Sequence, residues 1–208
     1  MVQKRKDAAP KRRGRPRAYD PQAALARAAA AFWNARYAGT SLDDLSEATG
    51  MNRPSLYAAF GDKRDLYLKT LDHYREQSRE LARQTLADDP PLRVFLRRFY
   101  SKALDLYFGE GARGCYTVGT AATVAAVDEK VRAFVAEGVR NADAFLRRRF
   151  EKAIERGELP GDADPAALAY VATGALHTLA VRSRAGLPRQ ELDALADAAI
   201  KVICGSER

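Results

Sequence analysis

The chain has 208 residues, of which 47% are hydrophobic, and a formal net charge of +8 at pH 7. This apolar content suffices for a packed core and excludes a globally disordered chain, while no apolar run reaches the length of a membrane-spanning helix or of a secretory signal. The two cysteines, Cys115 and Cys204, have the spacing of neither a metal site nor a disulfide framework, so we expect a cytoplasmic protein with no membrane partner and no cofactor.

The positive charge is concentrated at the N-terminus. Residues 1–17 contain eight basic side chains and one acidic side chain, and the rest of the chain is close to neutral. We predict a disordered basic arm over residues 1–19, because a block of like charge repels itself and attracts polyanions. The segment RGRPR within it resembles the core of an AT-hook, whose arginines enter a narrow A·T-rich minor groove. Nonspecific attraction to phosphates, or a solubilising tail that binds nothing, is the alternative. The arginines concerned are Arg13, Arg15 and Arg17.

From residue 20 onward the pattern is helical and lacks the alternation typical of strands. We expect helices over about residues 20–37, 41–49 and 52–60. The first begins at an aspartate cap followed by proline, and the second at a serine capping box. Gly50 breaks the chain between the second helix and the third.

Residues 41–60 have the form of a helix-turn-helix. The second helix of this unit is short enough to enter the major groove of DNA, which is about 12 Å wide. Its outward, N-terminal part would face the bases, where Arg53 is suited to guanine edges and Ser55 to base edges or phosphate. The candidate DNA-facing residues are Asn52, Arg53, Pro54, Ser55 and Tyr57.

The stretch GTSLDDLSEATGMNRPSLYAAFGDKRDLYLKTLDHY resembles the DNA-binding head of TetR-family transcription regulators. The resemblance covers about residues 20–74 and includes the Ser-Leu-Tyr element at residues 55–57 and the phenylalanine at position 60. It implies that Thr40, Tyr57 and Lys63 contact phosphates, which position the protein on DNA. For Tyr57, a packed core aromatic is the alternative. The residues that the resemblance places against base edges are Arg53, Pro54 and Ser55.

The remainder of the chain has the apolar spacing of further helices. We expect them over about residues 62–87, 92–107, 116–126 and 128–156, followed by two more near the C-terminus. With the first three, this makes about nine helices. We therefore predict an all-α fold. It would consist of a helix-turn-helix domain at residues 20–62 and a larger ligand-binding and dimerisation domain at residues 63–208.

The resemblance also implies a homodimer formed through the last two helices, which would pack with their copies as a four-helix bundle. Small residues on these helices allow close approach, although the same faces could pack inside one subunit. A dimer would place two heads about 34–36 Å apart, one turn of DNA, which matches a palindromic site. The small residues are Ala172, Ala175, Ala196 and Ala199.

A small-molecule site is implied among the middle helices. The candidate side chains combine apolar bulk with a few polar tips, as ligand sites usually do, although each could also be a core residue. His177 is the best polar candidate, and a hydrogen-bonded structural histidine is the alternative. The candidates are Phe99, Tyr100, Leu104, Tyr107, Phe108, Tyr116, Thr120, Phe134, Tyr170, Thr173 and His177.

Cys115 follows an arginine and a glycine at the end of a glycine-rich break. Nearby positive charge and a helix N-terminus favour the reactive thiolate form of a cysteine. Cys115 is therefore a candidate redox or electrophile sensor, and an inert small hydrophobe is the ordinary alternative.

These features predict a transcriptional repressor that binds a palindromic double-stranded DNA operator as a homodimer. A small-molecule effector would shift the helix at residues 62–87 and release the DNA. A TetR-like activator and an architectural protein that uses only the basic arm are alternatives. An enzyme is not expected, because the sequence lacks the phosphate loop with lysine, the His-Glu-x-x-His motif and the Gly-x-Ser-x-Gly motif.

Overall fold

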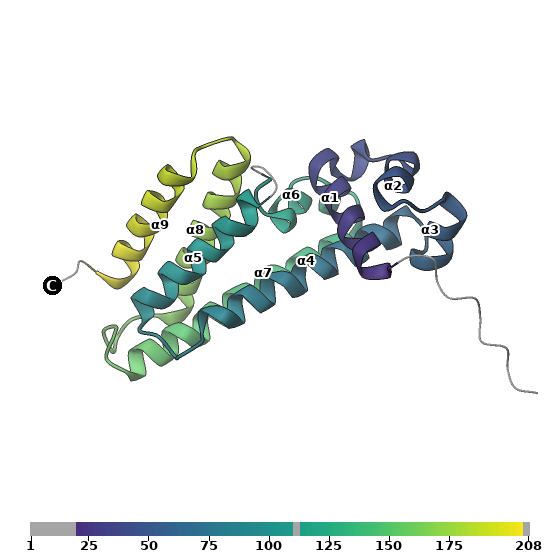
Figure 1. Cartoon of the computed structure of the whole chain (residues 1–208). Coiled ribbons are helices and arrows are strands. Elements are labelled where there is room, and N and C mark those ends of the chain that lie inside the picture. The colour runs from purple at the N-terminus through teal and green to yellow at the C-terminus, as the bar shows by residue number, and fades with distance from the viewer. Residues whose placement is uncertain (1–19, 110–112, 206–208) are drawn as a thin grey trace, which may run out of the picture.

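The computed structural model describes residues 20–109 and 113–205, and these residues form nine α-helices, one short 3-10 helix and no strand. Figure 1 shows α1, α2 and α3 gathered at one end and α5, α8 and α9 at the other, with α4 and α7 running lengthwise between them. This arrangement confirms the predicted all-α fold. Within the described residues, no helix is both long enough and apolar enough to cross a membrane. The elements are α1 (Pro21–Gly39), α2 (Leu42–Thr49), α3 (Arg53–Phe60), α4 (Lys63–Thr85), α5 (Leu92–Phe108), α6 (Tyr116–Ala121), η1 (Val124–Ala126), α7 (Glu129–Glu155), α8 (Pro165–Arg184) and α9 (Arg189–Cys204).

Side-chain caps set where the first four helices begin. The Asp20 carboxylate accepts a backbone N–H of α1 at 2.9 Å, and the Asn52 side-chain oxygen accepts one of α3 at 2.9 Å. Capping boxes begin α2 at Ser41 and α4 at Asp62. The first N–H groups of a helix have no partner inside the helix, so each cap fixes the start of its helix at one residue.

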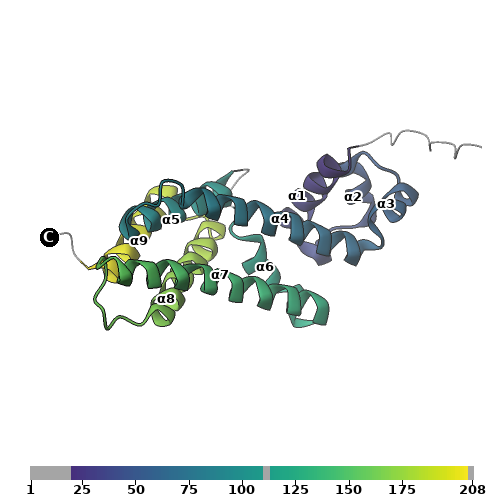
Figure 2. The same cartoon turned by 90° about the horizontal axis from the view of Figure 1, so that it is seen from below.

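Buried apolar side chains form two clusters. The first surrounds Phe32, Trp33 and Tyr67, and it joins α1–α4 to α6 and the first turns of α7. The second surrounds Phe95 and Phe150, and it lies among α5, the later part of α7, α8 and α9. We call these two parts the head and the body. α4 contributes only its first half to the head cluster, and Figure 2 shows that it continues from the head toward α5.

The segment predicted as one helix over residues 116–126 is divided, so that prediction is wrong in its detail. α6 ends at Ala121 and η1 follows it. Thr123 leaves the helical conformation between the two, and its hydroxyl donates to the carbonyl of Gly119 at 2.9 Å. Threonine hydroxyls compete in this way with the helical hydrogen-bond pattern, which explains why a threonine-rich segment breaks.

The small residues of the last two helices do not all face outward. Ala172 and Ala196 are buried in the core of their own subunit, and Ala175 packs partly against it. The expectation that Ala172 and Ala196 meet a second copy is therefore wrong, because the internal packing left open as the alternative applies to them. The exposed large apolar side chains of α8 and α9 are instead Tyr170, Val171, Val181 and Val202.

Candidate DNA-binding head and ligand cavity

A small core holds α2 and α3 at a fixed angle. Leu45, Leu56 and Phe60 are buried within the head cluster. Between the helices, Gly50 has a φ of 69°, a left-handed conformation that glycine adopts without strain. Arg27 of α1 donates to the last carbonyl of α2 at 3.1 Å. These contacts present α3 to solvent as part of a rigid unit.

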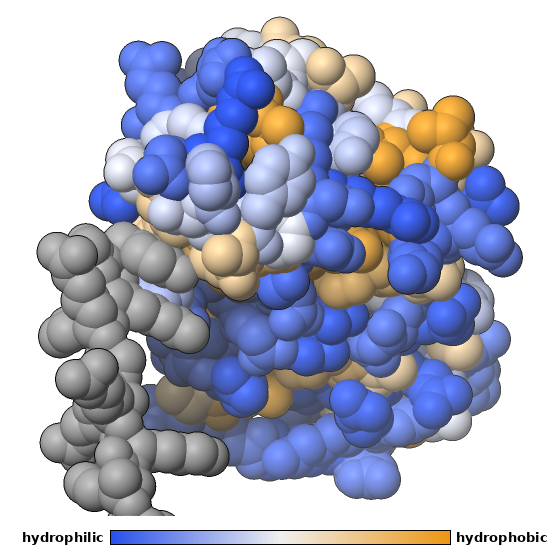
Figure 3. Space-filling model, turned by 90° about the vertical axis from the view of Figure 1, so that its right-hand side faces the viewer, coloured by the Kyte–Doolittle hydropathy of each residue, from blue (hydrophilic) through white to orange (hydrophobic). Residues whose placement is uncertain are grey.

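The outward face of α3 carries the side chains predicted to contact DNA. Arg53 and Pro54 are exposed, Ser55 is half-buried, and 47% of Tyr57 is exposed. The exposure of Tyr57 excludes the alternative of a packed core aromatic. Asn52 is already engaged as the cap of α3. Figure 3 looks onto this end of the molecule and shows a mostly hydrophilic surface, which suits contact with the polar groups of DNA.

Arg53 is held by an ion pair with Asp43 of α2. The guanidinium donates to the carboxylate through Nε at 3.0 Å and through Nη2 at 2.6 Å. This hydrogen bonding, together with the charge of Asp43, raises the pKa of Arg53. More than half of each side chain is exposed, and ion pairs of this kind contribute little to stability. Arg53 can therefore exchange the carboxylate for another acceptor.

Thr40 and Lys63, the two other predicted phosphate contacts in the described head, differ in their surroundings. The ammonium of Lys63 lies 4.4 Å from the centre of the Tyr37 ring, and burial lowers the pKa of Lys63. Only 1% of Thr40 is exposed, and its hydroxyl donates to the carbonyl of Arg36 at 2.7 Å. In this conformation the Thr40 hydroxyl faces the interior of the head and not solvent. The arm residues Arg13, Arg15 and Arg17 lie outside the described residues.

An aromatic cluster joins the head to the body. Trp33 of α1 stacks on Tyr116 of α6, with ring centres 5.5 Å apart, and meets Tyr74 of α4 edge-on at 4.9 Å. Tyr67 of α4 meets Tyr116 edge-on at 5.8 Å and shares a hydrogen bond of 2.8 Å with Thr120. Tyr116 and Thr120, both predicted as ligand contacts, therefore belong to this aromatic joint.

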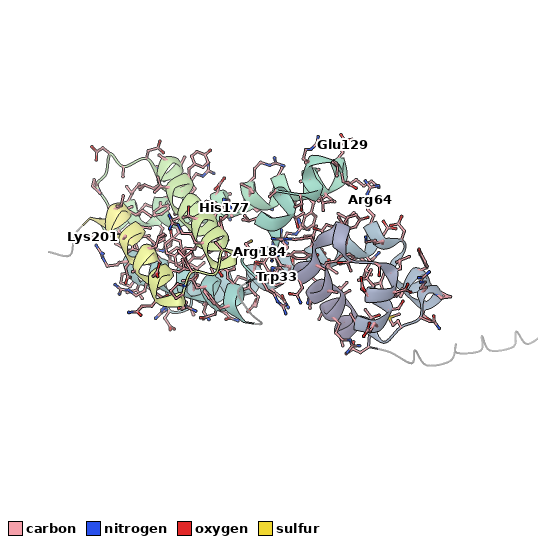
Figure 4. All side chains as sticks on the ribbon, turned by 90° about the horizontal axis from the view of Figure 1, so that it is seen from above. Trp33, Arg64, Glu129, His177, Arg184 and Lys201 are labelled. Carbon is pink, nitrogen blue, oxygen red and sulfur yellow. The ribbon has the colours of Figure 1, made fainter. Side chains whose placement is uncertain are left out.

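Arg184 connects α8 to the same joint. Its guanidinium donates to the carbonyl of Arg113 at 3.1 Å and to that of Trp33 at 3.4 Å. The indole N–H of Trp33 also donates to the Arg113 carbonyl, at 3.3 Å. Figure 4 shows Trp33 and Arg184 next to each other where the head meets the body. The position of α1 thus depends on α6, α8 and the segment before α6.

A cavity of about 460 Å³ lies among α4, α5 and α7, and is completed by residues of α6 and α8 and by Cys115. This volume is in the range of small-molecule sites. Much of its wall is aromatic or aliphatic. The predicted ligand contacts that line it are Phe99, Tyr107, Phe134 and His177, together with the candidate sensor Cys115.

The remaining predicted ligand contacts lie elsewhere. Tyr100 and Leu104 are buried in the body core, and Phe108 packs against that core. Thr173 is buried away from the cavity, whereas 65% of Tyr170 is exposed on α8. The physical reason is that α5 and α8 carry apolar residues on more than one face, so that only one of those faces can line the cavity.

Five basic side chains that the sequence analysis did not single out also line the cavity. Arg75, Arg79 and Arg83 follow one another at intervals of four along α4, and this spacing was the available signal. Lys102 comes from α5 and Arg148 from α7.

The cavity contains side chains whose pKa values are shifted from their ordinary range, at His177 and around Cys115. Burial lowers the pKa of His177, although the charge of Asp143 acts in the opposite direction. The Tyr74 hydroxyl donates to the sulfur of Cys115 at 3.4 Å. Burial, reinforced by the neighbouring thiol, raises the pKa of both Tyr74 and Tyr107. Two neutral tyrosine hydroxyls, those of Tyr74 and Tyr107, therefore adjoin the Cys115 thiol.

Comparison with known proteins assigns this architecture to a family. Residues 24–70 match the family described as "Bacterial regulatory proteins, tetR family", and residues 93–199 match "Tetracyclin repressor-like, C-terminal domain". The chain belongs to the TetR family. It is thus a DNA-binding transcription regulator with a helix-turn-helix, as the resemblance had indicated, and its family is one of transcription regulators and not of enzymes.

Individual relatives agree with this assignment. The HTH-type transcriptional repressor ComR of Escherichia coli (strain K12) is 26% identical over 92% of this chain and 92% of its own length. The uncharacterized HTH-type transcriptional regulator YezE of Bacillus subtilis (strain 168) is 33% identical over 75% of this chain and 81% of its own length. A cysteine mutant of the TetR-family regulator CifR, complexed with 26bp double-strand operator DNA, is 33% identical with a TM-score of 0.83, over 90% of this chain and 98% of that one.

Proposed function

We propose that this regulator represses transcription by binding a palindromic operator as a homodimer, and that a small molecule in the cavity releases it. The outward face of α3 carries this proposal, because Arg53, Pro54 and Tyr57 are exposed on a helix whose opposite side is fixed by the head core. The operator complex of CifR, a relative with the same fold, supports DNA binding, and the repressor ComR supports the sign of regulation.

In the proposed complex, α3 enters the major groove. Arg53 leaves Asp43 and donates to a guanine edge, while Pro54 and Ser55 lie against neighbouring bases. The exposed hydroxyl of Tyr57 and the ammonium of Lys63 contact phosphates. Residues 20–62 then form the DNA-binding domain, and residues 63–208 bind the ligand and form the dimer.

The exposed apolar face of α8 and α9 is the proposed dimer surface. Tyr170, Val171 and Val181 lie on α8, and Val202 lies on α9 with 78% of its surface exposed. Large apolar side chains that are exposed on two neighbouring helices are typical of an interaction surface. Two copies that pair through this face would form a four-helix bundle with two-fold symmetry, which matches the symmetry of a palindrome.

α4 is the proposed connection between ligand and DNA. Its first half, with Leu66 and Leu71, is buried in the head core, and its second half, with Arg75 and Ala82, lines the cavity. A ligand that displaces the second half therefore tilts the head. Because the coupling between two binding sites is reciprocal, ligand and DNA weaken each other's binding by the same coupling free energy, typically about 1–3 kcal/mol.

The test is selection of bound duplexes from a random DNA library at about 0.15 M salt, which suppresses nonspecific phosphate binding. We expect a palindrome. Deleting residues 1–17 should then reduce affinity and leave the preference for that palindrome intact. Recovery of A·T-rich DNA without symmetry, lost on deletion of the arm, would contradict the proposal and favour the architectural alternative.

The sign of regulation is tested with the selected palindrome placed over a promoter. A repressor lowers the output of a reporter when the protein is present, and an added ligand restores it. A rise in output on addition of the protein would instead identify a TetR-like activator.

One observation favours a second route of release, in which Cys115 reacts with an oxidant or electrophile. The thiol lines the cavity and accepts a hydrogen bond from Tyr74. N-ethylmaleimide should then release DNA from the wild type and from Cys204→Ser, a control that alters the other cysteine, and should fail to do so with Cys115→Ser. Equal release from all three proteins would contradict this route.

A further inference from the structure

We infer that the cavity takes an organic anion with an apolar body, and that it discriminates against neutral and cationic molecules of the same shape. This inference rests on the proposed function only in treating the cavity as the effector site. Among the lining residues that the structure describes, five are basic and none is a carboxylate. The basic residues are Arg75, Arg79, Arg83, Lys102 and Arg148.

Arg75 is paired with two carboxylates but keeps a buried donor that has no acceptor. Its buried Nε has no hydrogen-bond partner, and its buried Nη1 lies in an ion pair with Glu137 that lacks hydrogen-bond geometry. Its guanidinium lies 4.1 Å from the centre of the Phe134 ring, Nη2 meets Asp72 at 2.5 Å, and Nη1 stands 3.4 Å from Glu137. A buried donor without an acceptor is costly, and a carboxylate or phosphate can satisfy two N–H groups of one guanidinium at once.

Within the described part of the chain, the ion pairs of the two next arginines of α4 are with glutamates on the helix surface. Arg79 pairs with Glu76 at 2.5 Å and Arg83 pairs with Glu80 at 2.9 Å. Each pair joins residues three apart on the same helix and is about half exposed, so it contributes little and is easily exchanged. A ligand anion can therefore draw either arginine toward the cavity.

The other two basic residues are not neutralised by any described carboxylate. Lys102 of α5 donates to the amide oxygen of Gln84 at 3.3 Å, and Arg148 of α7 forms no described ion pair. Lys102 and Arg148 therefore add positive charge to the lining beyond the arginines that are already paired with carboxylates. A partly enclosed site strengthens the potential of these charges relative to open water, so that it attracts anions and repels cations.

The rest of the wall requires an apolar body on the ligand. Phe99, Leu106, Phe134 and Phe145 line the cavity, and the ring centres of Phe99 and Phe145 lie 6.2 Å apart. A small inorganic anion would leave these side chains in contact with water, whereas an aliphatic or aromatic chain would cover them. The geometry therefore favours an acid group at Arg75 and a hydrocarbon portion among the phenylalanines.

The test compares four probes with the same alkyl chain: octanoate, octyl phosphate, octanamide and octylammonium. Each is titrated calorimetrically into the full chain without DNA. We expect at least one of the two anions to bind, octanamide to bind about tenfold more weakly or worse, and octylammonium to bind least. Octanamide or octylammonium binding as tightly as the better anion would overturn the inference, as would the absence of binding by both anions. The relative affinity of octanoate and octyl phosphate identifies the preferred acid group.

Two variants test the assigned residues. Arg75→Met keeps the apolar stem and should weaken the better anion about tenfold while leaving octanamide unchanged. Arg148→Met should have the same sign and a smaller effect, and it carries the test if Arg75→Met does not fold, as checked by helix content. Arg147→Met is the matched control, because Arg147 is the adjacent residue of α7, pairs with Glu151 and does not line the cavity. Equal losses in all three variants, or no loss in either of the first two, would overturn the assignment.

Release of the selected operator is measured separately, by fluorescence anisotropy. An anion that binds the cavity without releasing DNA would uphold the ligand class and contradict the proposed release. Release by octanamide alone would do the reverse, because it would uphold the regulated repressor and contradict the anionic ligand.

Discussion

The proposed DNA-facing surface and the proposed ligand cavity of this regulator are assembled differently. The first comes from one short helix, α3, whose outward side chains project from a core that α1 and α2 complete. The second requires α4, α5 and α7 together, and its lining residues run from Tyr74 to His177. We therefore expect residue changes on α3 to alter DNA recognition without altering the fold, whereas cavity residues both line the cavity and pack helices against one another.

α4 belongs to both regions and therefore connects the cavity to the DNA-facing helix. Its first half is fixed by the head core and its second half forms a cavity wall. Under the proposed function, a ligand in the cavity displaces the second half of α4 and so moves the head that carries α3. The comparison therefore predicts that changes in the body act on DNA binding as a whole, and that changes on α3 act at individual bases.

The largest effect is expected from changes to the proposed dimer surface in the body. Val171→Asp combined with Val181→Asp places two charges on the exposed apolar face of α8 and should separate the subunits. Each head would then bind a half-site alone, and affinity for the palindrome should fall about 100-fold or more. Sedimentation velocity measures the subunit state, and anisotropy measures the affinity.

Val127→Asp is the control for this change. Val127 follows η1 and is 86% exposed, so the substitution adds a charge to an exposed valine outside α8 and α9. We expect it to leave both the dimer and the affinity unchanged. A double variant that stays dimeric would show that the subunits pair through another face.

A smaller and more local effect is expected in the head. Arg53→Ala should lower affinity on the order of tenfold for the selected operator and relax the preference at one base position. Tyr57→Phe should instead weaken all sequences about equally, because a phosphate carries no sequence information. Both side chains are exposed, so stability should not change. Repeating the library selection with each variant distinguishes them, and a uniform loss for Arg53→Ala would contradict its base-reading role.

The head was largely predictable from sequence because its determinants are local. The caps Asp20, Ser41, Asn52 and Asp62 lie within three residues of the N–H groups that they bind, and Gly50 marks the turn by itself. The division of α6 from η1 was missed because it depends on competition between hydroxyl and backbone hydrogen bonds, which residue spacing does not reveal.

The cavity was predictable only in part because its determinants are long-range. Phe99 and Tyr100 are adjacent aromatics, and only the packing of α5 against its neighbours decides that the first lines the cavity and the second enters the core. Tyr116 is of a residue type typical of ligand contacts, yet its ring stacks on Trp33 in the interior. The basic lining was missed because charged residues on a helix such as α4 are usually solvated. The contact between Arg75 and the Phe134 ring of α7, which places Arg75 at the cavity, depends on how the two helices pack.

The aromatic joint between the two regions provides a third test. Tyr116→Phe keeps the ring against Trp33 and removes the hydrogen bond that its hydroxyl shares with Thr70 at 3.0 Å. The free energy of unfolding should fall by about 1 kcal/mol, which corresponds to roughly 2–4 °C in the midpoint of thermal unfolding. Tyr57→Phe is the matched control and should leave this midpoint unchanged. An unchanged midpoint for Tyr116→Phe would show that the hydrogen bond between Tyr116 and Thr70 makes no net contribution to the free energy of unfolding.

The smallest effect is expected from Asp43, the acceptor that holds Arg53 in the absence of DNA. Asp43→Asn removes a negative charge beside the phosphates and frees Arg53, so affinity should rise by about two- to fivefold for operator and random duplexes alike at low salt, and the gain should fade as salt screens it. Asp197→Asn, at the far end of the body, removes the same charge and should change nothing. Anisotropy over a salt series measures both variants. A loss of operator affinity for Asp43→Asn would mean that the ion pair persists on DNA and orients Arg53 there. In that case the DNA-facing surface, like the cavity, would depend on a contact between two helices and not on α3 alone.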